Sequence, residues 1–571
     1  MLLKEDASIE KLSGRYFTPQ LIADFVTKWV LNQETNIKKI LEPSVGDGVF
    51  LRSLKSENVD KSSSILAIEI DEETSHIAAQ LSRFHHISGW HQKNQTEVDG
   101  DSLNVVVNDD FYHAYKNGLD KMRFQGILGN PPYIRYQYLT EEQREEQSEI
   151  LTKNKMKPNK LINAWVSFTV ACISCMDSSS RIGLVIPAEL LQVKYSEDLR
   201  KFLLTELNRC TIVTFDDLVF DDIEQEVVLL LGEKIKGDKE HSIKVVPFKN
   251  ADDLQEHSLN EFEFMNVDKE SNKWTRYFLN NEQIHLINTI KQSNEFVEFS
   301  DVAKCEVGIT TGNNAYFCIN EEIVEKYDLR KYCKPLIARS VNIKGVQFQK
   351  EDWEENIESG ARTYLLDLSP YEKSEFKDGV NNYIKWGEEN SHNTSYKTRI
   401  RDEWYKVPSV WSPDIFFLRR NYQFPKVMLN TEEVSAVSTD TMHRVRLKNH
   451  ADGKRLIVAY YTTVGLLFSE LEGRSYGGGV LEILPSEVSK IMLPNIFDAK
   501  KVTDAEIDIL FNKIDEFIRQ NGSDNIEVLI NELDNKILVE KIGLEINSVI
   551  ELRKAWKKLQ NRRLSRGRTA Q

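Results

Sequence analysis

The residues best suited to chemistry form the tetrapeptide Asn130-Pro131-Pro132-Tyr133, which directly follows the apolar run FQGILG. Two consecutive prolines fix φ at both positions and leave carbonyl oxygens without N–H groups of their own, so the loop is stiff. The side-chain oxygen of Asn130 and the carbonyl oxygen of Pro131 could each accept one hydrogen from an exocyclic amino group, while Tyr133 offers a ring for stacking. A rigid turn that caps a sheet would explain the prolines, but it would not require Asn130 and Tyr133 in the same loop.

Three earlier apolar runs end in residues typical of a site for a cofactor that carries adenosine. After the first run, Gly46 and Gly48 let the backbone approach a ligand closely. Glu69 ends the second run, where a carboxylate can accept both hydrogen bonds of a ribose diol. The third run ends in NDDF (108–111), in which either carboxylate could accept from an adenine amino group while the phenylalanine ring packs on the purine.

A repeated pattern of strands over the first 250 residues positions these groups. Short β-rich apolar runs alternate there with helical or loop segments. The runs are IKKILEP (37–43), SILAIEID (64–71), LNVVVNDDF (103–111), FQGILGNPPY (124–133), RIGLVIPAEL (181–190), TIVTFDDL (211–218) and EVVLLLGEK (226–234). Because runs that are apolar on both faces imply a buried, mostly parallel sheet, we expect an open α/β fold with seven strands. Ligands of such a fold bind beyond the carboxyl ends of its strands.

Departures from this pattern indicate how the rest of the chain is organised. Residues 134–160 are polar and charge-mixed, as expected either for a surface insertion or for a mobile lid over the site. From about residue 251 the strand pattern fades, and turn signals such as TTGNN (310–314) appear. From residue 501 the pattern becomes helical. We therefore expect three domains, at residues 1–250, 251–500 and 501–571.

The net charge of −15 would argue against binding of nucleic acid only if the charge were spread evenly over the protein. Seven basic residues face three acidic ones between Thr394 and Lys426, and the last 21 residues carry eight basic residues against Glu551. The basic residues from Tyr396 to Lys426 are interleaved with Trp404, Tyr405, Trp411, Phe416, Phe417 and Tyr422. That pattern is typical of a surface that lies along DNA, and it is equally typical of a half-buried sheet with charged rims.

Other features predict a cytoplasmic protein without a metal site or a membrane span. No apolar run approaches the roughly 18 residues of a transmembrane helix, and the first residues are acidic where a secretory signal would be apolar. Six scattered cysteines fit free thiols in a reducing compartment. Cys172 and Cys175 lie in the apolar stretch TVACISCM with no second pair or histidine nearby, and we interpret them as helix core.

Taken in order, these motifs resemble those of the gamma class of N6-adenine DNA methyltransferases, found in bacterial type II restriction–modification systems. The matching segments are GRYFTP (14–19), LEPSVGDGVFL (41–51), AIEID (67–71), NDDF (108–111), GILGNPPY (126–133), IGLVIPAEL (182–190) and Val219-Phe220 before EVVLLLGE (226–233). In the second half, VGITTGNNAYF (307–317) and SYGGGVLEILPSEVSKIMLP (475–494) also match. The order of the motifs and the signatures in the second half identify the class, since NPPY itself is shared with other methyltransferases.

The resemblance implies a Rossmann-like domain that binds S-adenosylmethionine, followed by an α+β target-recognition domain and a helical C-terminal segment. It implies that a monomer methylates N6 of an adenine flipped out of double-stranded DNA, which protects the site from a cognate restriction endonuclease. The implied cofactor residues are Thr18, Glu42, Gly46, Glu69, Asp110 and Phe111, and the implied target-base residues are Asn130, Pro131, Tyr133 and Phe220. From the residues alone, Thr18 is also typical of a helix N-cap before Pro19, and Phe220 of a core position.

Three rival functions share parts of this pattern. A protein methyltransferase acting on a glutamine amide would use the same NPPY chemistry, but such enzymes are compact, whereas about 320 residues follow the predicted catalytic domain here. A catalytically silent DNA-binding subunit would tolerate loss of Asn130 or Tyr133, and both are present. A fused restriction enzyme would need a nuclease motif, and Pro413-Asp414 has no Asp/Glu-x-Lys partner close by. The sequence therefore predicts a modification enzyme that works by positioning and polarisation.

Overall fold

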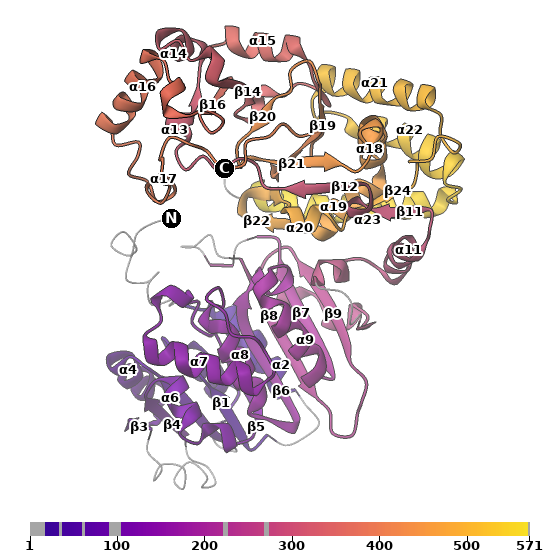
Figure 1. Cartoon of the computed structure of the whole chain (residues 1–571). Coiled ribbons are helices and arrows are strands. Elements are labelled where there is room, and N and C mark those ends of the chain that lie inside the picture. Colours follow the sequence, from indigo (N-terminus) through magenta and orange to yellow (C-terminus); the bar gives the residue numbers. More distant parts are fainter. Residues whose placement is uncertain are drawn as a thin grey trace. The chain divides into compact units, whose positions relative to one another are not determined.

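The computed structural model describes residues 17–32, 37–59, 63–90, 104–217, 219–220, 226–267 and 273–568. The chain divides into two compact units, Met1–Phe278 (unit 1) and Leu279–Gln571 (unit 2) (Figure 1). Unit 1 thus continues past residue 250, and residues 501–571 belong to unit 2 instead of forming a third body. No helix in the described part of the chain is long and apolar enough to cross a membrane.

Unit 1 is built on one large sheet. Its strands are β1 Lys39–Glu42, β2 Ser64–Glu69, β3 His85–Ser88, β4 Asn104–Asn108, β5 Phe124–Gly129, β6 Met176–Pro187, β7 Arg209–Phe215, β8 Val227–Lys234, β9 Ser242–Phe248 and β10 Met265–Asn266. The described strands lie in the order β10-β9-β7-β8-β6-β5-β1-β2-β4-β3. All seven predicted runs form strands, but ten strands of the sheet lie in the described residues, because β3, β9 and β10 add to the seven. The sequence does not predict β3 because its residues, HHIS, do not form an apolar run. It does not predict β9 and β10 because they lie on either side of the expected domain boundary at residue 250.

The direction of the strands determines where the site lies. β1 pairs in parallel with β2 on one side and with β5 on the other, and β2 pairs in parallel with β4. Because the strand order reverses at β1, the carboxyl ends of β1, β2, β4 and β5 meet beside a topological switch point. β8 runs antiparallel between β6 and β7. The predicted α/β fold with a mostly parallel sheet is therefore confirmed.

Two rows of helices accompany the sheet. They comprise α2 Gln20–Leu31, α3 Val49–Ser56, α4 Glu72–Ser82, α6 Phe111–Lys116, α7 Glu141–Lys153, α8 Ala164–Ser174, α9 Glu197–Glu206 and the short α10 Asp253–Glu256. α2, α3 and α4 contact one another in series, as do α6, α7, α8 and α9. α2 packs very closely on β6, since a Cβ atom at Gly183 would come within 2.6 Å of Val26. This close packing fixes the position of the residues that lead into α2.

Unit 2 contains several smaller sheets. Its strands are β11 Phe296–Glu298, β12 Ala303–Glu306, β13 Cys318–Ile319, β14 Cys333–Ile337, β15 Gln347–Phe348, β16 Tyr364–Leu366, β17 Ile415–Leu418, β18 Arg420–Asn421, β19 Val427–Asn430, β20 Val437–Ser438, β21 Met442–Leu447, β22 Arg474–Tyr476, β23 Val480–Glu482 and β24 Met492–Pro494. The largest of the described sheets has the order β12-β21-β17-β19-β15, and a second has the order β13-β16-β14-β20. This mixture of sheets and helices is the α+β organisation that the sequence predicts.

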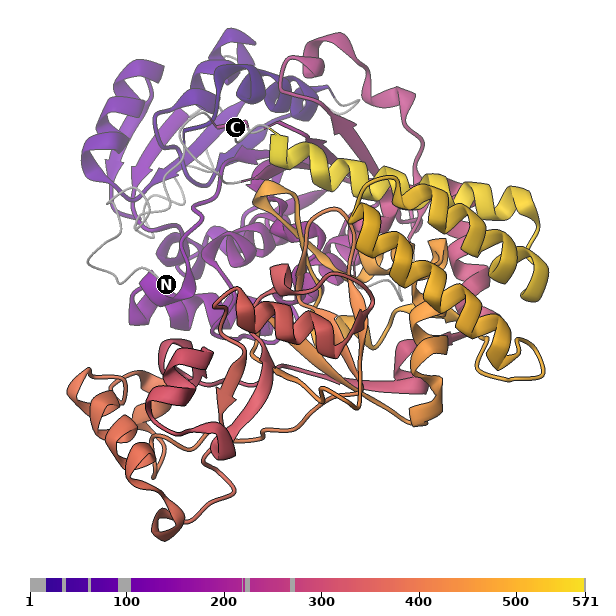
Figure 2. The ribbon, with the colours of Figure 1, turned by 90° about the horizontal axis from the view of Figure 1, so that it is seen from above.

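The helices of unit 2 include a C-terminal group. They are α11 Asn281–Gln292, α12 Phe299–Val302, α13 Asn314–Phe317, α14 Glu321–Lys326, α15 Lys350–Glu358, α16 Asp378–Glu389, α17 Tyr396–Arg399, α18 Gly453–Tyr460, α19 Thr463–Glu472, α20 Pro485–Val488, α21 Asp504–Asn521, α22 Ile526–Leu533, a π-helix Asp534–Lys541 and α23 Ile546–Arg568. α21, α22 and α23 form the yellow group in Figure 2. This group confirms the predicted helical C-terminal segment.

The basic end of the chain is anchored in the core of unit 2. Arg563, whose side chain is 2% exposed, pairs with the equally buried Glu470 of α19 at 2.6 Å. It also donates to the carbonyl oxygens of Tyr422 and Gly479. These contacts give α23 a structural role, so its charges are not those of a free basic arm.

Candidate active site

A pocket lies where β1, β2, β4 and β5 end. Six of the residues that the sequence assigns to a site line it: Thr18, Gly46, Glu69, Asp110, Phe111 and Asn130. The structure thereby brings together groups that are more than 100 positions apart in the sequence. The other assigned residues, Glu42, Pro131, Tyr133 and Phe220, are not part of the lining.

The glycine turn after β1 and the end of β2 are held together by Glu69. Its carboxylate accepts the backbone N–H of Gly46 at 2.9 Å and that of Asp71 at 3.0 Å. Gly46 and Gly48 both have left-handed backbone conformations, with φ of 55° and 76°, which favour glycine. A Cβ atom at Gly46 would meet no neighbour within 4 Å, so the backbone is open to the pocket there.

The two neighbouring aspartates after β4 have different partners. Asp109 accepts the backbone N–H groups of Trp90 and Asp110, and its carboxylate lies 3.0 Å from Nδ1 of His113. Asp110 caps α6 by accepting the N–H of Tyr112 at 2.7 Å, and its other oxygen accepts from Nε2 of Gln143 at 2.7 Å. Both carboxylates line the pocket. Asp109 accepts two backbone N–H groups, whereas Asp110 accepts one. This difference favours Asp110 as the carboxylate that binds a ligand.

The polar segment 134–160 forms part of the pocket wall. Ile134, Leu139 and Gln143 line the pocket, and Gln143 closes a capping box with Thr140 at the start of α7. The segment is therefore more than a surface insertion. Sequence reasoning missed Gln143, because it stands in a charged helix whose orientation depends on packing against α6 and α8.

Aromatic rings make up another part of the wall. Phe168 of α8 stacks on Phe111, with 4.5 Å between the ring centroids and 28° between the planes. Phe17 also lines the pocket and is 63% exposed. Phe168 lies in a uniformly apolar helix, so the sequence offers no signal that separates it from the core.

Asn130 is oriented by Thr18. The Nδ2 group of Asn130 donates to Oγ1 of Thr18 at 3.1 Å, and Oγ of Ser44 donates to the carbonyl oxygen of Asn130 at 3.0 Å. Thr18 does not cap a helix: α2 begins at Gln20 after Pro19 and has no side-chain cap. The N-cap interpretation of Thr18 is therefore wrong, because a tertiary hydrogen bond takes its hydroxyl instead.

Two assigned aromatic residues lie outside the pocket lining. The Tyr133 hydroxyl donates to the carbonyl oxygen of Val185 on β6 at 3.1 Å, which ties the NPPY loop to the neighbouring strand. Phe220 is buried at 5% exposure, next to residues 221–225, which lie outside the described part of the chain. Pro131 is buried, whereas its neighbour Pro132 lines the pocket.

Glu42 is completely buried at the end of β1. Neither of its carboxylate oxygens has a hydrogen-bond partner within the described residues. Burial, reinforced by the nearby charges of Asp47 and Glu69, raises the pKa of Glu42 well above its usual range. A buried carboxylate in this position favours either a proton or a cationic ligand group.

Part of the basic segment from Tyr396 to Lys426 is structural. Phe416 and Phe417 of β17 are fully buried in unit 2, so they offer no surface to DNA. Arg419 and Arg420 both donate to Glu482, at 2.9 and 3.2 Å. The interpretation as a surface along DNA is therefore wrong for Phe416 and Phe417, because this apolar pair in a basic stretch forms a core strand, as the alternative of a half-buried sheet predicts.

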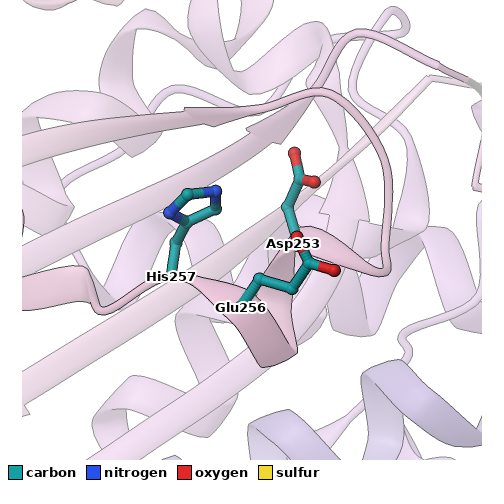
Figure 3. A group of neighbouring side chains, drawn as sticks. All are labelled: Asp253, Glu256 and His257. Carbon is teal, nitrogen blue, oxygen red and sulfur yellow. The ribbon is translucent and has the colours of Figure 1, made fainter.

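Two groups with metal-ligating side chains lie elsewhere in unit 1. Cys172 and Cys175 are buried at the end of α8, as interpreted from the sequence, and burial raises the pKa of both thiols. Asp253, Glu256 and His257 at α10 have ligand atoms within 4.8 Å of one another (Figure 3). Asp253 already accepts the N–H of Lys249, and the other two side chains are exposed.

The sheet order, the glycine turn after β1 and the acidic groups at the ends of β2 and β4 are those of a Rossmann-like methyltransferase fold. The sequence model of the N-6 DNA methylase family matches residues 1–318, and that of the C-terminal domain of type II methyltransferase M.Eco57I matches residues 271–538. The chain belongs to the N-6 DNA methylase family. This confirms the predicted adenine-specific DNA methyltransferase and does not favour a glutamine protein methyltransferase.

Several known proteins are similar to this chain. Type II methyltransferase M.AccI of Acinetobacter calcoaceticus is 26% identical over 553 residues, which cover 93% of this chain and 94% of the relative. M.HincII of Haemophilus influenzae is 28% identical over 253 residues, 42% of this chain and 41% of the relative. Among solved structures, the type IIG restriction endonuclease BpuSI matches with a TM-score of 0.41 and 13% identity, covering 97% of this chain and 67% of that one. A structural similarity of this size does not bear on function.

Proposed function

We propose that this protein transfers a methyl group from S-adenosylmethionine to N6 of an adenine flipped out of double-stranded DNA, and so protects that site from a cognate restriction endonuclease. The observation that carries the proposal is that Glu69, Asp110 and Asn130 line the same pocket. Two carboxylates suited to an adenosine cofactor thus share a pocket with the amide suited to the target amine. The protective role is supported by the relatives, which are named type II methyltransferases.

The residues of the pocket fit the cofactor. Each Glu69 oxygen has two lone pairs, so the carboxylate can accept a ribose diol in addition to its backbone donors. Phe111 and Asp110 offer a ring and an acceptor for the adenine, and the open backbone at Gly46 leaves room for a ligand. Glu42 is not part of the lining, but it is buried at the end of β1 with no hydrogen-bond partner among the described residues, which suits a cationic group of the cofactor. When bound, S-adenosylmethionine supplies an electrophilic sulfonium methyl group.

The chain's own part in the reaction is to orient and polarise the amine. The lone pair of an aromatic amine is delocalised into the ring, so the amine is a poor nucleophile. Acceptance of its two hydrogens by Oδ1 of Asn130 and the carbonyl oxygen of Pro131 would draw the nitrogen toward tetrahedral geometry and release the lone pair. Thr18 supports this role by holding the Nδ2 end of the Asn130 amide, which leaves the oxygen end for the substrate.

The aromatic residues hold the flipped base. Because the Tyr133 hydroxyl is committed to Val185, its contribution to the base comes from the ring face. Phe220 is the second stacking surface in this proposal. Extrusion of a base costs a few kcal/mol, and stacking on two rings offsets that cost.

Mapping of N6-methyladenine in DNA from cells that express the chain tests the proposal. We expect methylation at one recurrent sequence with the natural chain and its near-complete loss with Asn130→Ala, while purified Asn130→Ala still binds DNA and cofactor. Asn521→Ala, at an exposed asparagine that ends α21, is the matched control and should methylate normally. Near-normal methylation by Asn130→Ala would contradict the amine-polarising mechanism, and no N6-methyladenine from the natural chain would contradict the function.

A further inference from the structure

Two large apolar side chains stand out from the surface of unit 2 at α17. Tyr396 is 65% exposed and Ile400, one turn later, is 58% exposed. Residues four positions apart lie on the same face of a helical turn, so the two side chains form one small apolar ridge. In Figure 1, α17 lies at the tip of a projection below α13 and α16.

The ridge is held rigidly by the TTGNN loop (310–314). Oγ of Ser395 donates to the carbonyl oxygen of Gly312 at 2.9 Å, just before α17. After α17, a guanidinium nitrogen of Arg401 donates to the carbonyl oxygen of Thr310 at 3.1 Å. Both ends of the helix are therefore fastened to one loop, and the two apolar side chains project from a fixed base.

The glycine of that loop is needed for the position of α17. Gly312 has φ of 82°, and a Cβ atom there would come within 2.6 Å of Cβ of Lys397. Any side chain at position 312 would therefore push α17 away from the loop. The TTGNN loop therefore positions α17, the helix that carries the ridge.

The surroundings of the ridge are basic. Residues 390–401 contain Lys397, Arg399 and Arg401 and no acidic residue. Neither Lys397 nor Arg399 takes part in an ion pair within the described part of unit 2, in contrast to Arg419 and Arg420, which share Glu482. An apolar ridge flanked by Lys397 and Arg399, which form no ion pair within the described residues, suits a polyanion whose interior is apolar, which is the chemistry of stacked bases between phosphates.

We propose that Tyr396 and Ile400 form a wedge that inserts at a base step of bound DNA and partly unstacks it, while Lys397 and Arg399 hold the flanking phosphates. The inference rests on the proposed function, because it takes DNA as the substrate. It adds a deformation of the duplex at a defined step to the contacts that a recognition unit makes. Steps that unstack easily are then favoured at that place in the recognition sequence.

Fluorescence of 2-aminopurine, placed in turn at each position of a duplex that carries the mapped methylation site, tests the wedge. With the natural chain, we expect a rise at one step besides the target adenine, because an unstacked 2-aminopurine is brighter. Tyr396→Ala with Ile400→Ala should abolish that signal and weaken binding of the duplex about tenfold. A mismatch at the same step, which removes much of the unstacking cost, should restore most of the binding.

Two further variants distinguish insertion from a general loss of fold or affinity. Gly312→Ala keeps both wedge residues but displaces α17, so it should also lose the signal. Ile509→Ala, at an apolar residue of α21 that is 67% exposed, should bind and fluoresce like the natural chain. Thermal unfolding checks that all variants remain folded.

The possible outcomes separate the two proposals. Methylation by the natural chain, with an unchanged fluorescence pattern and unchanged affinity in the double variant, would overturn the wedge and leave the proposed function intact. A change only in the oligomeric state of the double variant would also overturn it, in favour of a contact between two copies of the chain. Absence of methylation by the natural chain would instead reject the proposed function and the wedge together.

Discussion

Replacement of Thr18 by valine should slow methyl transfer without weakening cofactor binding. Valine matches the shape of threonine but lacks Oγ1, the acceptor that lies 3.1 Å from Nδ2 of Asn130. Thr18 is only 6% exposed, so water does not readily replace the lost hydroxyl. A hydrogen bond of this kind contributes about 0.5–1.5 kcal/mol net, which converts to a fall in kcat of about 2- to 13-fold if it orients the amide in the transition state. Thr18→Ser keeps the hydroxyl and should stay near the natural rate.

The assay is transfer of a labelled methyl group from S-adenosylmethionine into the mapped duplex, with kcat and KM measured separately for each variant. A positioning role lowers kcat and leaves KM for the cofactor nearly unchanged. A direct contact between Thr18 and the cofactor, which the family resemblance implies, would instead raise KM in Thr18→Val. An unchanged kcat in Thr18→Val, or an equal loss in Thr18→Ser, would refute the positioning role of Thr18.

Two predictions concern stability. Because the raised pKa of Glu42 lets the folded protein keep a proton that the unfolded chain releases, folding loses stability as the pH rises from the unfolded value near 4.5 toward the raised value. Glu42→Gln should therefore raise the midpoint of thermal unfolding at about pH 7 and above and change it little below about pH 4, and an equal shift at all pH values would contradict this assignment. Arg563→Met leaves the buried carboxylate of Glu470 without its ion-pair partner Arg563, so it should destabilise unit 2 by about 3–5 kcal/mol in urea unfolding. Addition of Glu470→Gln should recover much of that loss, and strictly additive effects would show that the two residues do not form a pair.

The sequence predicts well what local patterns determine. Runs such as SILAIEID and EVVLLLGEK are apolar on both faces, and both form buried strands of the large sheet. Glu69 and Asn130 follow such runs, so the rule that ligands bind at the carboxyl ends of strands is enough to bring them to one pocket. Strand ends and glycine turns are the local patterns on which this prediction depends.

The sequence does not predict the side-chain contacts that depend on tertiary packing. Gln143 reaches Asp110 only because α7 packs beside α6, and nothing in a charged helix signals that contact. Thr18 matches a helix cap locally, but its hydroxyl goes to a residue 112 positions away. Phe416 and Phe417 resemble DNA-facing aromatic residues because of their basic neighbours, yet they are core residues. In each case tertiary packing decides the role of the side chain, and the neighbouring residues in the sequence do not reveal it.

The anchoring of α23 through Arg563 has a consequence for how the protein is made. Unit 1 ends at Phe278, and the described strands of its sheet end at Asn266, so it can fold while the ribosome is still synthesising the rest of the chain. Unit 2 cannot complete its folding at that stage, because two of its contacts need residues from late in the sequence. β11 pairs with β24, and Glu470 forms its ion pair with Arg563 of α23. A nascent chain that stops within α23 would carry a finished first unit beside an unfinished second one.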